Sequence, residues 1–117
     1  MNEFVLPLAE ARDAASAGGK GTSLGELARA GVKVPPGFVI TAEAFSAALG
    51  VVDPGGARRA EISALPATDL AAITRAAAAF REQVVAAALP PPVAGAIESA
   101  YATLATCPVS AFVTCRV

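Results

Sequence analysis

The most informative absence in this sequence of 117 residues is histidine, of which there is none. Without an imidazole the chain cannot form a Ser–His or Cys–His nucleophile pair, and it cannot carry a phosphoryl group on histidine. Any chemistry must rest on lysine, arginine, carboxylates and backbone amides. Cys107 and Cys115 are the only cysteines, and no carboxylates stand at metal-binding spacing beside them. We therefore expect ordinary reduced thiols and no metal site in this chain.

Aromatic residues and net charge are also scarce. Aromatics make up 5% of the chain and hydrophobic residues 55%, much of it alanine, which favours helices packed closely through small side chains. Nine basic and ten acidic residues give a net charge of -1 without a basic run, so no nucleic-acid partner is expected. No apolar stretch reaches about 18 residues and the first residues lack the features of a secretion signal, so we expect a cytoplasmic protein without a membrane partner.

The length and pattern predict one unit, residues 1–117, of the mixed α/β (α+β) class. Two short apolar runs predict its strands. The run at residues 4–8 contains Pro7 and so suits a sheet edge, whereas Phe38–Ile40 is rich in β-branched and aromatic residues and suits a buried strand.

Helices are expected to fill most of the remaining sequence, about four in all. Thr41 is a good N-cap for a helix that has Glu43 in its first turn and ends at Gly50. Residues 53–59 are rich in turn formers and are expected to form a surface loop. Two further helices, one beginning near Thr68 or Asp69 and one with Pro92 as its first residue, are predicted from apolar residues spaced three or four apart: Leu70, Ile73, Ala77, Phe80 and Val84, then Val93, Ile97, Tyr101 and Leu104.

One local feature suggests chemistry, the sequence Gly18-Gly19-Lys20-Gly21. It lies in a predicted loop, residues 17–23, before a helix that should stop at Gly31. Glycines let backbone N–H groups approach an anion, the helix start points its donors the same way, and Lys20 adds a positive charge. We expect Lys20 to share a pocket with the amides of Gly19 and Gly21.

The glycine-lysine sequence is not a P-loop. That motif needs glycine where Ala14 stands and Ser or Thr directly after the lysine, where this chain has Gly21. The simpler interpretation is a flexible helix entrance with a solvated lysine.

The wider sequence resembles the opening of the nucleotide-binding domain of the phosphoenolpyruvate synthase, pyruvate phosphate dikinase and rifampin phosphotransferase family. The resemblance runs without gaps over residues 17–45, through Gly-Gly-Lys-Gly-Thr-Ser-Leu-Gly-Glu-Leu, then Ala-Gly-Val, then Val-Pro-Pro-Gly-Phe-Val-Ile-Thr. Leu89-Pro90 and the helix after it, which ends in Ala-Tyr-Ala-Thr-Leu at residues 100–104, are also similar to that family. The resemblance is weakest over residues 51–67.

The resemblance implies an ATP-grasp type of fold in which Lys20 contacts the phosphates of ATP, with Gly19 and Gly21 beside it. In that family ATP is split to AMP, and a phosphoryl group passes through a histidine on a separate domain to pyruvate or to an antibiotic hydroxyl. ATP and, in the complete domain, Mg²⁺ are therefore the implied cofactors. The sequence does not distinguish pyruvate, phosphate or an antibiotic as acceptor. A fragment of such a site should be inactive alone and need the rest of the domain or another chain.

The end of the chain departs from the family. Residues 1–109 are family-like, whereas the family continues with a strand reading approximately Val-Ala-Val-Arg-Ser-Ser, and residues 110–117 do not. One interpretation aligns Arg116 with the arginine of that strand, in a diverged tail. The other is a frameshift, because codons permitted for Ser110 to Thr114 encode Val-Arg-Ser-Ser when read one base later. On that interpretation the chain is a truncated product.

Three functions remain open on the sequence. The first is the ATP-binding start of a dikinase-type phosphotransferase, and the second is a non-catalytic nucleotide-binding or partner-binding module completed by another chain. The third is a small helical scaffold whose glycines only cap a helix. ATP binding that depends on Lys20 would separate the first two from the third.

Overall fold

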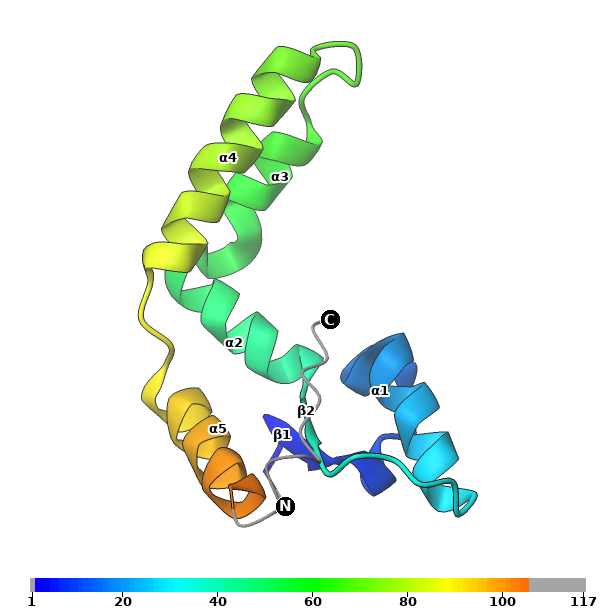
Figure 1. Cartoon of the computed structure of the whole chain (residues 1–117). Helices are drawn as coiled ribbons and strands as arrows, with labels where there is room; N and C mark the ends of the chain where they lie inside the picture. The colour runs from blue at the N-terminus through cyan, green and yellow to red at the C-terminus, as the bar shows by residue number, and fades with distance from the viewer. Residues whose placement is uncertain (1, 106–117) are drawn as a thin grey trace. The chain divides into compact units, whose positions relative to one another are not determined.

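A computed structural model describes residues 2–105 of the chain, and the predicted tail at residues 110–117 lies outside them. The described residues form a two-stranded sheet and five α-helices, which confirms the expected mixed α/β class (Figure 1). They divide into two compact units, one from residues 2–45 with 91–105 and one from residues 46–90.

The sheet of the first unit pairs β1 (Val5–Pro7) with β2 (Phe38–Ile40) in antiparallel register, with Leu6 opposite Val39. Both strands lie where the sequence predicted them. The hydroxyl of Thr41 extends the pairing by donating to the carbonyl of Glu3 at 2.6 Å. Pro7 has no backbone N–H to donate to the sheet, but it is the last residue of β1, so the strand pairing is not interrupted.

A short 3₁₀ helix, η1 (Leu8–Glu10), leads into α1 (Ala14–Arg29). The core of this unit consists of Ala11, Ala17 and Val39, with Leu6 and Leu8 packed against it. Alanines in that core allow the backbone of α1 to lie close to the sheet.

The loop expected at residues 17–23 is largely helical, which corrects the sequence-based prediction. The helix α1 runs through this segment and is interrupted only at Gly18, whose φ of 73° and ψ of 164° are not helical. Asp13 caps the first turn by accepting the N–H of Ala15 at 3.1 Å. Glycines favour a loop, but Gly21 is buried within the helix, where packing outweighs its poor helix propensity.

The predicted stop at Gly31 is confirmed. Its φ is 82°, and its N–H donates to the carbonyl of Ala28 at 3.2 Å. The next amide, from Val32, donates to the carbonyl of Leu27 at 3.0 Å, which completes a Schellman motif.

The helix α2 (Ala42–Val52) begins as predicted at Thr41, whose hydroxyl accepts the N–H of Ala44 at 3.3 Å. It continues beyond Gly50, the expected end, for two more residues. Gly50 has no positive φ, so nothing in its backbone terminates the helix.

The second unit contains a 3₁₀ turn, η2 (Pro54–Gly56), and the helices α3 (Ala57–Ser63) and α4 (Leu70–Ala86). The surface loop predicted at residues 53–59 is therefore wrong in its last part, which is the start of α3. Gly55 and Gly56, with φ of 74° and 75°, make the turn, and the buried carboxylate of Asp53 then caps the helix. A cap at this distance has no simple local signature.

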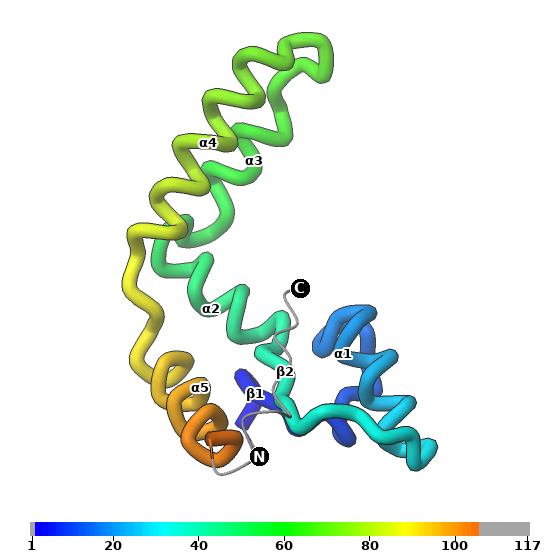
Figure 2. The backbone as a smooth tube through the Cα atoms, in the orientation of Figure 1, coloured from blue at the N-terminus to red at the C-terminus, as the bar shows by residue number. Residues whose placement is uncertain are grey.

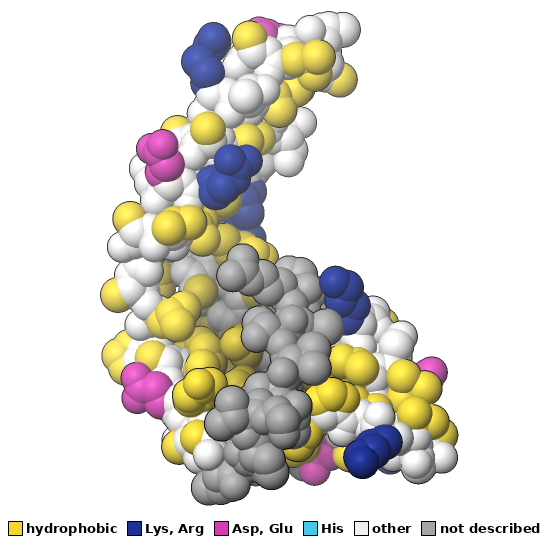
Figure 3. Space-filling model, in the orientation of Figure 1, with side chains coloured by type: hydrophobic (Ala, Val, Ile, Leu, Met, Phe, Trp, Pro, Cys, Tyr) yellow, Lys and Arg dark blue, Asp and Glu magenta, His cyan; other side chains and the backbone are white. Residues whose placement is uncertain are grey.

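The helices α3 and α4 lie side by side in Figures 1 and 2 and contact each other. The Arg58 side chain of α3 donates a hydrogen bond to the amide oxygen of Gln83 on α4. The helix α4 begins where predicted, and Asp69 caps it by accepting the N–H of Ala72 at 3.0 Å. The predicted apolar stripe is only partly buried: Ile73, Ala77, Phe80 and Val84 are half-buried, and Leu70 is 70% exposed. Val85, which lies outside the stripe, is 80% exposed. Hydrophobic side chains accordingly reach the surface along this pair of helices (Figure 3).

The helix α5 (Pro91–Leu104) belongs to the first unit and contacts β1. Val93 and Ala96 are its buried residues, whereas Tyr101, which was predicted on the same face, is 63% exposed. Within residues 2–105, no helix has both the length and the apolar character needed to cross a membrane.

Candidate functional site

The buried face of α1 carries only small residues, Ala17, Gly21 and Gly25, which repeat every four positions. A Cβ atom on Gly25 would lie 2.5 Å from the carbonyl oxygen of Ala11, and one on Gly21 would lie 3.1 Å from Cγ2 of Val39. Glycine at these two positions therefore lets the helix approach η1 and β2 closely. This packing fixes which side of α1 faces outward.

The outward side of the same segment carries the candidate phosphate-binding residues. Gly19, Lys20, Ser23 and Leu24 line an open surface hollow of about 510 Å³. A Cβ on Gly19 would meet nothing within 4 Å, so the backbone is accessible there. Two of the three residues predicted for the site, Gly19 and Lys20, thus lie together on the hollow.

Gly21, the third predicted residue, is placed differently. It is buried on the opposite side of α1, against Val39, and it is not among the residues that line the hollow. Its geometry fits close packing. Ser23, which sequence reasoning did not single out, lines the hollow because it lies one helical turn after Gly19 and Lys20.

The break at Gly18 makes Gly19 and Lys20 part of the first turn of a new helical segment. The hydroxyl of Thr22 donates to the carbonyl of Gly18 at 2.8 Å, and this hydrogen bond links the first and last residues of the turn. The first turn of a helix carries the positive end of the helix dipole. A glycine, a lysine and such a turn in one open hollow provide the groups that bind a phosphate.

A second polar feature lies in the turn before the break. The hydroxyl of Ser16 donates to Oε2 of Glu43, in the first turn of α2, at 2.8 Å. This hydrogen bond, followed by the backbone amide of Glu43, lowers the pKa of the Glu43 carboxyl below its ordinary value. Sequence reasoning identified Glu43 only as a favourable first-turn charge. Its partner lies 27 residues away, so no local pattern pointed to the contact.

Magnesium binding is not accounted for by the described residues. Within residues 2–105 no group of three His, Cys, Asp or Glu side chains is placed to hold a metal ion. The donors at the hollow are a lysine, a hydroxyl and backbone amides, which suit an anion and do not suit a cation. Mg²⁺ remains a prediction for the complete domain.

A helix start that carries a glycine and a lysine, on a mixed α/β unit, is a feature of many nucleotide-binding proteins. Comparison with known families agrees: residues 14–116 match the family described as pyruvate phosphate dikinase, AMP/ATP-binding domain. The chain belongs to this family.

Several curated proteins are similar to the chain. It is 40% identical over 93 residues, 77% of its length, to a probable phosphoenolpyruvate synthase of Methanocaldococcus jannaschii. It is 38% identical over 80% of its length to a rifampicin phosphotransferase of a Streptomyces species, and 36% identical over 90% to a phosphoenolpyruvate synthase of Pseudomonas aeruginosa. The chain spans 8%, 11% and 14% of the lengths of these three proteins.

Proposed function

We propose that the chain supplies the phosphate-binding part of the ATP site in a phosphotransferase of the phosphoenolpyruvate synthase and pyruvate phosphate dikinase type. The observation that carries this proposal is the position of Lys20 and Gly19 on one open hollow, at a helix start, in a chain of the AMP/ATP-binding family. Lys20 would neutralise phosphate charge, and the exposed backbone around Gly19 would donate hydrogen bonds. Gly21 would contribute by letting α1 pack closely.

The chain by itself should not catalyse phosphoryl transfer. It contains no histidine to carry the phosphoryl group, and the described residues offer no cluster of carboxylates for Mg²⁺. We infer that activity needs the remaining part of the domain, or another chain, together with a separate histidine domain. The relatives named above are phosphoenolpyruvate synthases and a rifampicin phosphotransferase, so pyruvate and an antibiotic hydroxyl are both candidate acceptors. The cytoplasm is the proposed location.

Binding of ATP to the chain, followed by calorimetry, tests the proposal through a matched pair of lysine variants. Lys20→Ala should weaken ATP binding at least tenfold, about 1.4 kcal/mol, the scale of a charge-assisted phosphate contact. Lys33→Ala removes the same charge from the exposed segment after α1 and should change little. Equal effects of the two substitutions would mean that the glycine-lysine segment is only a helix entrance.

Turnover tests the wider phosphotransferase proposal. A chimera in which residues 1–109 replace the matching segment of the Pseudomonas aeruginosa phosphoenolpyruvate synthase should form AMP in the presence of pyruvate, and Lys20→Ala should reduce that rate. The isolated chain should form none. Pyruvate-dependent AMP formation by the isolated chain would contradict its assignment as one part of a larger site.

A further inference from the structure

The hydrogen bond between Ser16 and Glu43 joins two helix starts within the first unit. Ser16 lies in the turn of α1 that precedes Gly18, and Glu43 lies in the first turn of α2. Their 2.8 Å contact connects residues 27 positions apart. The contact joins two side chains and is separate from the backbone hydrogen bonds of the helices and the sheet.

The turn that contains Ser16 needs such a support. A continuous helix would hold it in line with the rest of α1, but the non-helical backbone of Gly18 interrupts the helix directly after it. Gly18 is also the residue from which the turn of Gly19 and Lys20 starts. A change in the orientation of the preceding turn would therefore move the Gly19 and Lys20 amides.

The other end of the contact is firmly anchored. Thr41, 2% exposed, caps α2 by accepting the N–H of Ala44 and is itself bonded to the carbonyl of Glu3. Glu43 thus projects from a helix start whose capping residue is also hydrogen-bonded to Glu3, just before β1. It can serve as a fixed point for the Ser16 hydroxyl.

We propose that Glu43 is a positioning residue of the phosphate-binding hollow: by holding the Ser16 hydroxyl, it fixes the turn before Gly18 and so the direction in which Gly19 and Lys20 face an anion. This inference rests on the proposed function. A carboxylate placed against a polyphosphate would repel it, so Glu43 acts through Ser16 and does not contact the nucleotide itself. Its removal weakens binding, whereas removal of a merely repulsive charge would strengthen it.

The test is a double-mutant cycle on the full chain, with ATP and inorganic tripolyphosphate as probes in calorimetry. Ser16→Ala and Glu43→Ala should each weaken binding of both probes by roughly three- to tenfold, the effect of losing one hydrogen bond to a charged group at an exposed site. The double variant should lose no more than the weaker-binding single variant, because both substitutions remove the same contact. Glu43→Gln should stay closer to the wild type, since its amide oxygen can still accept from Ser16.

Two substitutions serve as controls. Glu26→Ala removes an equal charge from the exposed side of α1, and Ser46→Ala removes an exposed hydroxyl from α2. Both should bind like the wild type. The proposal is overturned if Glu43→Ala binds as well as or better than the wild type, or if the losses of the two single variants multiply in the double variant.

A measurement without nucleotide separates this proposal from the proposed function. Amide chemical shifts of Gly18, Gly19 and Lys20 in ¹⁵N spectra should change in Ser16→Ala and Glu43→Ala but not in the controls. If the wild type binds neither probe, the proposed function fails for this chain, and these shifts alone decide whether the contact fixes the turn. Unchanged shifts in both variants would show that it does not.

Discussion

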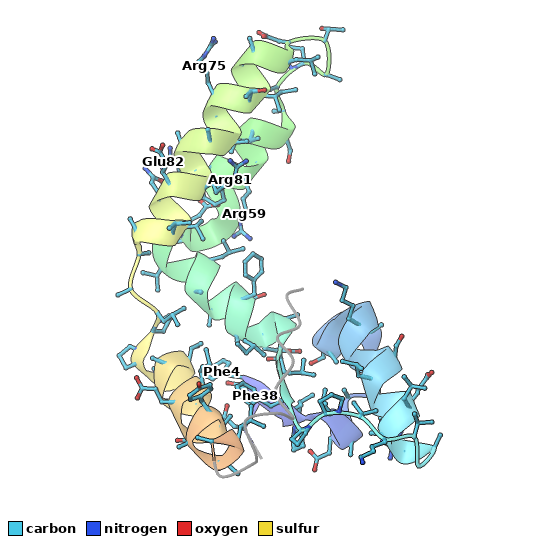
Figure 4. All side chains as sticks on the ribbon, in the orientation of Figure 1. Phe4, Phe38, Arg59, Arg75, Arg81 and Glu82 are labelled. Atoms are coloured by element: carbon cyan, nitrogen blue, oxygen red, sulfur yellow. The ribbon has the colours of Figure 1, made fainter. Side chains whose placement is uncertain are left out.

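The carboxylate of Asp53 accepts a hydrogen bond from Nε of Arg59 at 2.9 Å, although only 2% of the Asp53 side chain is exposed. The same carboxylate accepts the backbone N–H groups of Arg58 at 3.0 Å and Arg59 at 3.2 Å. One buried side chain therefore satisfies two donors of the first turn of α3 and pairs with a guanidinium from that turn. Figure 4 labels Arg59 on α3, while Arg75 and Glu82 point away from the helix pair. The start of α3 depends on Asp53.

Asp53→Ala should consequently destabilise the second unit. The substitution leaves two helix donors and a guanidinium without their acceptor, and loss of an N-cap of this kind lowers the melting temperature of a small domain by roughly 5 °C. Melting followed by circular dichroism at 222 nm measures the change. Asp69→Ala, which removes the exposed cap of α4, should cost less, and Glu61→Ala should cost almost nothing. An Asp53 variant that melts like the Glu61 variant would contradict the role given to this carboxylate.

Acid should weaken the same contact. The Arg58 amide above all lowers the pKa of Asp53 below its ordinary value, burial acts in the opposite direction, and the Arg59 side chain adds to the lowering. Because the folded pKa lies below the unfolded value of about 3.9, the contribution of Asp53 to stability is complete above that pH and is lost as the pH falls through the folded pKa. Urea unfolding of the wild type and Asp53→Asn between pH 7 and pH 2.5 should show their difference shrinking below about pH 4. A difference that stays constant would exclude this linkage.

Close packing predicts a strong contrast between two glycines. A Cβ on Gly25 would lie 2.5 Å from the carbonyl oxygen of Ala11 and 2.6 Å from that of Leu8, and backbone atoms cannot move away cheaply. Gly25→Ala should therefore destabilise the chain by about 3 kcal/mol. Gly50→Ala, in a helix and with nothing within 4 Å of its Cβ, should stabilise it by about 0.5–1 kcal/mol. Chemical denaturation of both variants checks whether the free energy of unfolding falls for Gly25→Ala and rises for Gly50→Ala. Equal effects would mean that α1 does not approach η1 as described.

The sequence predicted the features that depend on nearby residues. The strand Phe38–Ile40, the cap at Thr41, the start of α4 near Asp69 and the stop at Gly31 are all confirmed, because each rests on local backbone chemistry. The packing of the glycines in α1 was not predictable in this way. In a sequence, a glycine required for close approach to Val39 looks the same as one required for a loop.

The remaining misses have a similar physical cause. The helix α3 starts with a cap from Asp53, which lies five residues before the first amide that it accepts, and turn-forming glycines occupy the space between. The contact of Ser16 with Glu43 joins two distant segments, so it follows only from the fold. By contrast, the placement of Gly19 and Lys20 on one hollow could be anticipated, because they are neighbours in a recognisable sequence.

Gly21 packs against Val39, whereas Gly19 lies on the exposed side of α1. A Cβ on Gly21 would lie 3.1 Å from Cγ2 of Val39, so Gly21→Ala should cost stability through a contact with a single side chain. Replacing Val39 by alanine removes the obstructing methyl groups, and the double variant Gly21→Ala/Val39→Ala should be more stable than the sum of the two single losses predicts.

ATP binding by the same variants shows whether Gly21 acts through packing alone. If Gly21 only packs, ATP affinity of the folded Gly21→Ala/Val39→Ala protein should remain within about threefold of the wild type. Lys20→Ala, which changes a residue that lines the hollow, should lose at least about tenfold. Calorimetry well below the melting temperature separates the two effects. An ATP affinity that falls with Gly21→Ala and is not restored in the double variant would place Gly21 among the phosphate-binding residues, as the sequence first suggested, and would show that its amide contributes more than its packing.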